Sequence, residues 1–324
     1  MTHWQHLLLT LALLVGLPAA MCQPTPVNPA PVVTGGSTST GGASATGGVS
    51  RGGVSATGGV SATGGTTVAE VRFPECNSAA AKIKPIDRAK IKLGRKHGPV
   101  VKSRKVSYEI DASAKSVFWR ATVPWALDQA DLGACTGFAT VQARLTKPFL
   151  LSTIPGVPTT LAEFEQLARD VYSGATKRDQ WPGVWPPTDS GSSGSAALDE
   201  ALARHLIDGY GTVSSLAEMQ HALQSGPLIF GVDWYDGMFS PSRCGEIKPT
   251  GSVRGGHEIT IVGLDVDAKT VWGETSWNNE FGVCLEGHCG YFYMSYGMVS
   301  QLFAAGGEAE QPVNDNATKM VVGF

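Results

Sequence analysis

Cys135 is the residue whose type and position most directly suggest chemistry. Apolar residues follow it at helical spacing, among them Phe138 and Ala139, and they predict a helix that begins around Cys135. The positive end of a helix dipole favours a thiolate in the first turn, which lowers the pKa of the thiol and makes its sulfur a nucleophile. A cysteine on a helix is also commonly an inert core residue, so the helix alone leaves both interpretations open.

Four segments place Cys135 in a wider pattern. Residues 128–139 read DQADLGACTGFA, with Gln129 six residues and Gly133 two residues before the cysteine. Residues 255–265 (GGHEITIVGLD) carry a Gly-His pair that leads into an apolar strand, and 275–282 (TSWNNEFG) and 290–295 (GYFYMS) follow. In this order and at comparable separations, the four segments resemble the motifs of papain-like cysteine peptidases. Leu132 stands where many members have a disulfide cysteine, which favours a bacterial or viral-type branch of that family.

The resemblance covers roughly residues 107–303 and implies an α+β fold with two lobes. One lobe would be helical, the other β-barrel-like, with a cleft between them. Local patterns agree with this fold. They predict helices at 161–172, 196–207 and 216–223, and buried strands at 228–234 and 258–264.

By resemblance, Cys135 is the nucleophile and His257 forms its ion pair, then protonates the leaving amine. The Gln129 side chain and the Cys135 backbone N–H would form the oxyanion hole. The product is an acyl-enzyme thioester that water hydrolyses, and no cofactor or metal is required. The expected partner is a peptide or protein substrate.

Three further residues are candidates for substrate binding. In the family, a glycine-containing turn at the position of Gly191 and Ser192 contacts the substrate backbone. A loop with a helix N-cap and no further role is an equally open interpretation. Trp277 would supply the aromatic ring that shields the site.

The third catalytic position departs from the family pattern. Thr275 stands where an asparagine usually orients the imidazole, and Asn278 or Asn279 would be alternatives if the turn folds back. Glu258 directly follows His257, but alternation along a strand predicts that its side chain points to the opposite side. These departures keep two alternatives open: a catalytically weakened protein that binds peptides or cell-wall material, and a Cys-His amidase or transglutaminase.

The N-terminal residues carry targeting signals rather than a fold. Residues 1–22 resemble a signal peptide, with an apolar core from Leu7 to Met21. Cys22 raises the alternative of a lipid anchor, against a plain secretory signal. Residues 23–67 are rich in Pro, Gly, Ser and Thr and predict a flexible linker. We therefore expect a secreted, periplasmic or cell-surface protein.

Residues 68–106 form a basic segment ahead of the peptidase-like domain at 107–324. Ten Lys or Arg residues and one acid lie between Lys82 and Lys105. A solvated entry strand is the favoured interpretation, and a short leader or a contact with an anionic surface is the alternative. The whole chain of 324 residues has a net charge of −3, which argues against a charge-driven nucleic-acid binder. A monomer is expected.

Four cysteines remain besides Cys22 and Cys135. They permit three disulfide pairings, of which a local bridge between Cys284 and Cys289 is the most direct because it would close a hairpin. A metal site at Cys284, His288 and Cys289 is the alternative, but a structural zinc needs a fourth ligand. Disulfides suit an exported protein.

Overall fold

The computed structural model describes residues 71–76, 91–97, 114–149, 151–153 and 156–314. The chain divides into two units, Met1–Gly64 and Gly65–Phe324, and every described residue belongs to the second. The predicted signal peptide, the linker and Cys22 lie outside the described residues. Within the described part, no helix has the length and apolar character needed to cross a bilayer.

The described residues form α-helices, short 3₁₀ helices and strands. The helical elements are α1 (Cys135–Arg144), η2 (Leu151–Thr153), α2 (Leu161–Arg178), α3 (Gly194–Ala203), α4 (Leu216–Ala222), η3 (Asp236–Phe239), η4 (Asn278–Glu280) and α5 (Tyr296–Ala304). The strands are β1 (Val117–Phe118), β2 (Gly209–Val213), β3 (Leu228–Tyr235), β4 (Val253–Asp265), β5 (Thr270–Glu274), β6 (Val283–Leu285), β7 (His288–Ser295) and β8 (Glu308–Val313).

The strands that the structure describes belong to one eight-stranded sheet. Its order is β2-β8-β3-β4-β5-β7-β6, with β1 paired to β4, and every pairing is antiparallel. Helices combined with an antiparallel sheet make an α+β fold, as predicted. The expected barrel does not form among these strands. The short β6 folds back on β7, and β2 ends the other side of the sheet.

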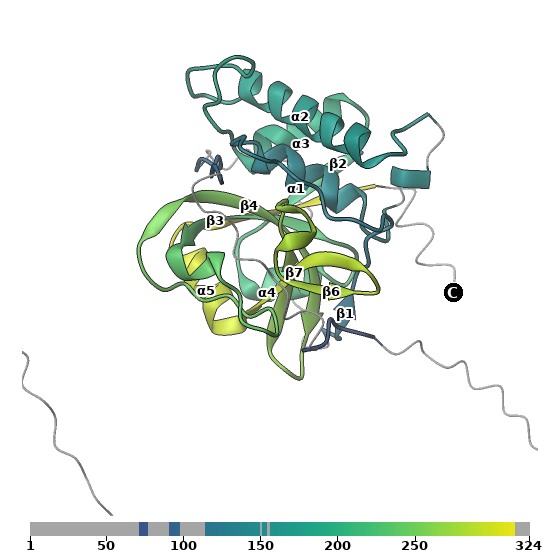
Figure 1. Ribbon diagram of the computed structural model, residues 1–324, viewed down its shortest axis with the longest axis vertical. Coiled ribbons are helices and arrows are strands. Elements are labelled where there is room, and N and C mark those ends of the chain that lie inside the picture. The colour runs from purple at the N-terminus through teal and green to yellow at the C-terminus, as the bar shows by residue number, and fades with distance from the viewer. Residues whose placement is uncertain (1–70, 77–90, 98–113, 150, 154–155, 315–324) are drawn as a thin grey trace, which may run out of the picture. The chain divides into compact units, whose positions relative to one another are not determined.

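Helix α1 is the central support of the molecule, because each of its residues is buried. It packs against α2, α3 and β4, and Figure 1 shows α1, α2 and α3 together on one side of β3 and β4, with α5 away from them. Gly137 lets α1 approach α2 closely, since a Cβ there would lie 2.3 Å from the Ala168 carbonyl oxygen. This packing fixes the N-terminus of α1, where Cys135 lies.

The apolar core has a sheet part and a helix part. The sheet part includes side chains of β3, β4 and α5, among them Phe230, Trp234 and Ile259. Phe138 and Phe164 belong to the cluster between α1 and α2. Helix α1 also packs against β4. These two elements carry the candidate nucleophile Cys135 and the candidate base His257.

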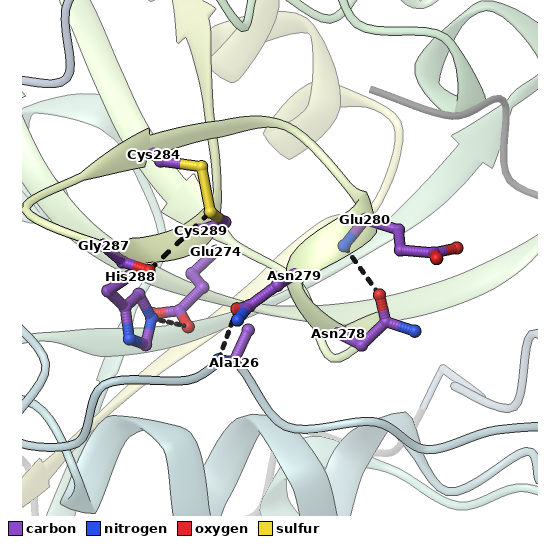
Figure 2. Close-up of a disulfide and its surroundings, with 9 residues drawn as sticks. All are labelled: Ala126, Glu274, Asn278, Asn279, Glu280, Cys284, Gly287, His288 and Cys289. Carbon is purple, nitrogen blue, oxygen red and sulfur yellow. Dashed lines mark hydrogen bonds and ion pairs between the residues drawn. A yellow bond between two sulfur atoms is a disulfide. The ribbon is translucent and has the colours of Figure 1, made fainter. Parts of the chain in front are cut away.

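Two disulfides join segments of the described chain. Cys284 bonds Cys289 across the β6–β7 hairpin, which confirms the predicted local bridge (Figure 2). Cys76 bonds Cys244 and thereby fastens residues 71–76 to the loop before β4. The metal alternative is wrong, because the sulfurs of Cys284 and Cys289 are bonded to each other. Such bonds are typical of proteins that fold in an oxidising compartment.

Candidate active site

Cys135 opens α1, as the sequence predicted, and its side chain is completely buried. Burial raises the pKa of the thiol to about 12, although nearby backbone N–H groups of Glu258 and Gly94 act in the opposite direction. Cys135 is also the free cysteine of the described residues. The predicted lowering of its pKa by the helix dipole is therefore wrong for this arrangement.

The magnitudes explain why burial outweighs the helix dipole. A charge at a helix terminus is typically stabilised by about 0.3–1 kcal/mol, which is less than about one pKa unit. Full burial of an ionisable group shifts its pKa by up to about 3–5 units. A thiol without solvent therefore stays protonated even at a favourable helix end.

His257 lies on β4, completely buried, and two side chains fix its ring. Its Nε2 atom lies 2.8 Å from the Thr275 hydroxyl oxygen, and its ring stacks on Trp277 at a centroid distance of 4.5 Å and an angle of 19°. The Nδ1 atom has no hydrogen-bond partner among the described residues. Burial lowers the pKa of His257 to about 3, so the ring is neutral at ordinary pH.

Cys135 and His257 belong to the same small region although they are far apart in sequence. The backbone N–H that favours the Cys135 thiolate comes from Glu258, the residue directly after His257. The loop before α1 is also attached to the loop after β5, since the Gln129 backbone N–H donates to the Ser276 carbonyl at 3.0 Å. The start of α1 therefore meets both β4 and the segment that contains Thr275.

Gln129 is buried and its side-chain amide is fully engaged. Its Nε2 atom donates to the carbonyl oxygens of Lys92, at 3.1 Å, and Leu132, at 2.7 Å. Its Oε1 atom accepts a 2.6 Å bond from the Ser276 hydroxyl. One donor of the predicted oxyanion hole therefore faces a peptide carbonyl, that of Lys92.

The two asparagines that could have oriented the imidazole bond elsewhere. Asn278 donates to the Asp128 carboxylate at 3.0 Å and accepts from the Glu280 N–H. Asn279 accepts a 3.0 Å bond from the Ala126 N–H, and Figure 2 shows its side chain directed there. Among the candidates, Thr275 is the one that bonds the imidazole.

Residues 91–97 lie between the glycine-containing turn and β4. The Ser192 N–H donates to the Gly94 carbonyl at 2.8 Å, the Lys96 N–H donates to the Ser192 carbonyl at 2.8 Å, and the Arg95 N–H donates to the Gly256 carbonyl at 2.9 Å. Gly94 and Arg95 are buried, so the favoured prediction of a solvated strand is wrong here. The turn at Gly191 and Ser192 binds backbone in this structure, and the backbone it binds is the chain's own.

Glycines permit this close passage. A Cβ at Gly94 would lie 1.8 Å from the Gly133 carbonyl oxygen, and one at Gly191 would lie 2.0 Å from the Gly94 carbonyl oxygen. Gly191 also has a φ of +74°, in the region that favours glycine. Segment 91–97 therefore passes directly over the loop that precedes the nucleophile.

Glu258 points away from the imidazole, which confirms the prediction from strand alternation. Its carboxylate oxygens lie near Gly194 and Gly231, 3.0 Å and 2.8 Å from where a Cβ would stand on these glycines. The His257 ring instead contacts Trp277 and Trp234. Glu258 is therefore not a partner of the imidazole.

Asp189 is a site residue that the sequence did not single out. It accepts hydrogen bonds from the Gly133 N–H at 3.0 Å and the Tyr172 hydroxyl at 2.5 Å, and it pairs with Lys92 at 2.5 Å. Burial acts against ionisation, but these donors hold the pKa of Asp189 below its usual value. The signal was its place at the head of the glycine-containing turn.

Solved structures with a similar backbone are cysteine proteases. Xylellain, a cysteine protease from Xylella fastidiosa, is 19% identical, covers 69% of this chain and 98% of its own, and gives a TM-score of 0.40. Procathepsin L 3 from the larval midgut of Tenebrio molitor is 15% identical, with coverages of 72% and 78% and a TM-score of 0.47. The proform of the ragweed pollen allergen Amb a 11, a cysteine protease, is 17% identical, with coverages of 65% and 70% and a TM-score of 0.37.

TM-scores below 0.5 do not assign a function to this chain. No family model matches the chain. No curated protein matches it either.

Proposed function

We propose that the chain is a papain-like cysteine peptidase with a helical lobe, a sheet lobe and a substrate cleft between them. The observation that carries the proposal is the meeting of Cys135, at the start of α1, with the peptide that follows His257 on β4. The imidazole is held at Nε2 by Thr275, which leaves Nδ1 for the proton of the thiol.

The reaction follows from these positions. The Cys135 sulfur attacks the carbonyl carbon of the substrate while its proton passes to His257 Nδ1. The Gln129 amide and the Cys135 N–H stabilise the oxyanion, and His257 then donates its proton to the departing amine. Water, deprotonated by His257, cleaves the resulting thioester, so that the acid is released and the thiol restored.

Segment 91–97 acts in this proposal as a short leader that covers the nucleophile. Its Lys92 carbonyl accepts from the Gln129 amide, as a substrate carbonyl would, and its Gly94 N–H favours the Cys135 thiolate. Withdrawal of the segment would readmit water, which lowers the cost of forming the thiolate–imidazolium pair.

Export completes the proposal. The two disulfides agree with an extracellular or periplasmic site of action, and residues 1–22 would supply the signal. Residues 23–67 would then act as a tether, with Cys22 as a lipid anchor if the signal is of the lipoprotein type. The chain would act as a monomer on peptides or proteins, and Leu132, in the position of the usual cysteine, supports a bacterial or viral-type branch that lacks that cysteine.

The reaction class can be tested by comparing hydrolysis of a casein-like substrate with hydrolysis of purified cell-wall peptide. Wild-type chain should cleave the casein-like substrate, and Cys135→Ser and His257→Gln should each abolish that cleavage while they retain the fold by circular dichroism. Cleavage of wall peptide alone would replace the peptidase by an amidase. If the chain binds these peptides but cleaves neither the casein-like substrate nor the wall peptide, it is a binding protein.

A further inference from the structure

Arg95 is a buried charge that the proposed reaction does not use. Its side chain is 0% exposed, which is rare for an arginine without a dedicated partner. Its Nη2 atom pairs with the Glu308 carboxylate at 3.0 Å and contacts the Gly306 carbonyl at 3.4 Å. Its Nη1 atom lies 3.2 Å from His97 Nε2. Arg95 therefore enters the sheet lobe from the segment that covers Cys135.

Three glutamates from two strands surround it, and we call Glu258, Glu308 and Glu310 the acidic cluster. Gly231 on β3 pairs with Glu258 on one side and with Glu308 on the other, so these two side chains stand on the same face of the sheet. Glu310 lies two residues along β8, which returns it to that face. The sheet register itself gathers the three carboxylates.

Gly231 opens the space that the guanidinium fills. A Cβ there would lie 2.5 Å from Arg95 Nε and 2.8 Å from a Glu258 carboxylate oxygen. Any other residue at the centre of the acidic cluster would displace Arg95. The sequence thus provides a recess for a flat cationic group between carboxylates of neighbouring strands.

Arg95 leaves part of this recess unsatisfied. Glu258 Oε1 and Glu310 Oε2 are buried and have no hydrogen-bond partner among the described residues, and neither has Arg95 Nε. Burial, together with neighbouring carboxylates, raises the pKa of Glu310 to about 8 and that of Glu258 well above its usual value. The recess therefore holds more acceptor capacity than Arg95 uses, so a better-placed basic group could replace it.

We propose that the acidic cluster is a specificity pocket for an arginine-like side chain of the substrate, which Arg95 occupies until substrate replaces it. The inference rests on the proposed peptidase function. The inference follows from chain continuity, because Arg95 is adjacent to Gly94, which packs against Gly133 just before Cys135 and whose N–H favours the Cys135 thiolate. A substrate residue one position from the reacting carbonyl would place its side chain where Arg95 now lies.

Selectivity would come from the carboxyl groups that a substrate side chain other than a basic one leaves without a partner. An apolar group in the pocket would leave the buried carboxyl groups of Glu258 and Glu310, and the partly exposed one of Glu308, without a cation, and an acidic group would add a fourth carboxyl group. A buried polar group without a hydrogen-bond partner is costly, and sites that leave their own polar groups without partners discriminate strongly against the wrong substrate. A basic residue would restore the pairing that Glu308 makes now.

Two peptidyl acyloxymethyl ketones test the proposal. They differ only in the residue before the one that bears the ketone, which is arginine in one probe and its neutral isostere citrulline in the other. Labelling rates of Cys135, read by peptide mass mapping of the full chain, should be about tenfold or more higher with arginine, as expected for a charge-assisted hydrogen bond. Glu308→Gln and Glu258→Gln should each bring the two rates close together.

Two further variants complete the design. Glu286→Gln is the matched control, since Glu286 is a solvent-exposed glutamate that pairs with Arg120 outside the acidic cluster. The ratio of the labelling rates with the arginine and citrulline probes should be the same in this variant as in wild type. Arg95→Ala removes the side chain that occupies the acidic cluster. The arginine probe should therefore label Cys135 faster in this variant than in wild type.

The outcomes separate the two proposals. Equal rates for both probes in wild type and Arg95→Ala, with labelling still lost in His257→Gln, would overturn the pocket and leave the peptidase. An arginine-to-citrulline rate ratio that stays at the wild-type value in both Glu308→Gln and Glu258→Gln would also overturn the pocket and leave the peptidase. Absence of labelling in wild type and Arg95→Ala, or labelling that His257→Gln does not slow, would overturn the peptidase and the pocket with it.

Discussion

His257 and His288 are two buried histidines in one sheet whose surroundings drive their protonation in opposite directions. His257 on β4 bonds the neutral hydroxyl of Thr275, and burial lowers its pKa to about 3. His288 on β7 lies 2.6 Å from the Glu274 carboxylate, shown in Figure 2. Burial acts against the charged form there as well, but the charge and hydrogen bond of Glu274 raise the pKa of His288.

The two rings also differ in how many of their nitrogen atoms are occupied. His288 uses both, because Nδ1 lies 2.9 Å from the Val123 carbonyl oxygen. His257 uses only Nε2 within the described part of the chain. A histidine with both nitrogens bonded and a carboxylate partner stabilises the fold, whereas one with a neutral partner and an unoccupied nitrogen can accept and return a proton. Four predictions follow from this difference.

The largest effect is expected on activity. His257→Gln should lower kcat/KM on a peptide substrate by about 10³-fold, within the range that a general acid–base contributes. His288→Gln, corrected for the folded fraction, should retain wild-type kcat/KM within about threefold. Steady-state kinetics with both variants at one pH makes the comparison. A comparable loss in both variants would mean that the unoccupied nitrogen of His257 has no special role.

The second prediction concerns stability. His288→Gln should lower the free energy of unfolding by about 3 kcal/mol, because it removes one partner of a buried ion pair and leaves Glu274 uncompensated. Urea denaturation at pH 6 measures this loss. Glu274→Gln in the same protein should remove most of the further cost of the His288 change, since the pair is then already broken. Additive losses in the double variant would contradict a coupled pair.

The third prediction is a pair of opposite pH dependences. A lowered pKa at His257 means that the unfolded chain binds the proton more readily. The contribution of His257 to stability should therefore fall as pH drops from about 6.5 toward 3, by about 1.4 kcal/mol per pH unit. A raised pKa at His288 contributes stability that is present below about pH 6.5 and lost as pH rises through its folded value.

Denaturation curves at several pH values separate these contributions. The acid slope of wild type should become shallower in His257→Gln and stay in His288→Gln. The loss of stability above pH 6.5 should be smaller in His288→Gln than in wild type, because only the part due to the raised pKa values of Glu258 and Glu310 would remain. A wild-type acid slope retained in His257→Gln would show that carboxylates alone produce it.

The smallest effect is expected at the orienting hydroxyl. Thr275→Val should lower kcat about tenfold with little change in KM, because the ring would lose its bond at Nε2 but keep its stacking on Trp277. Thr275→Ser, which retains the hydroxyl, should restore most of kcat. Equal activity of the valine and serine variants would remove Thr275 from the account.

Local patterns predicted helices α1 to α4 and strands β3 and β4, but not β2, β5, β8 or α5. Helix α1 begins at Cys135 as expected, and β3 and β4 contain the predicted strands. Helix α2 starts at Leu161 as predicted but continues to Arg178, beyond the expected end. Helix α3 ends before the predicted Ile207, because the chain turns through His205 with a φ of +57°.

What the sequence could not predict depends on contacts between distant segments. The dipole argument at Cys135 considered one helix and could not include the burial that Gly94 produces. The acidic cluster was equally hidden, because Glu258 and Glu308 become neighbours only through their shared partner Gly231. Basic composition suggested that Arg95 was solvated, since nothing local shows where a side chain is buried.

The most direct test of the central claim is the pH dependence of Cys135 alkylation by iodoacetamide in the full chain, read by peptide mass mapping. We predict slow labelling in wild type and much faster labelling in Arg95→Ala that persists down to about pH 5–6 and disappears when His257→Gln is added. That result would establish that Cys135 and His257 form a thiolate–imidazolium pair once segment 91–97 no longer covers them. Labelling that rises only near the ordinary thiol pKa of about 8.5, with or without His257, would contradict it.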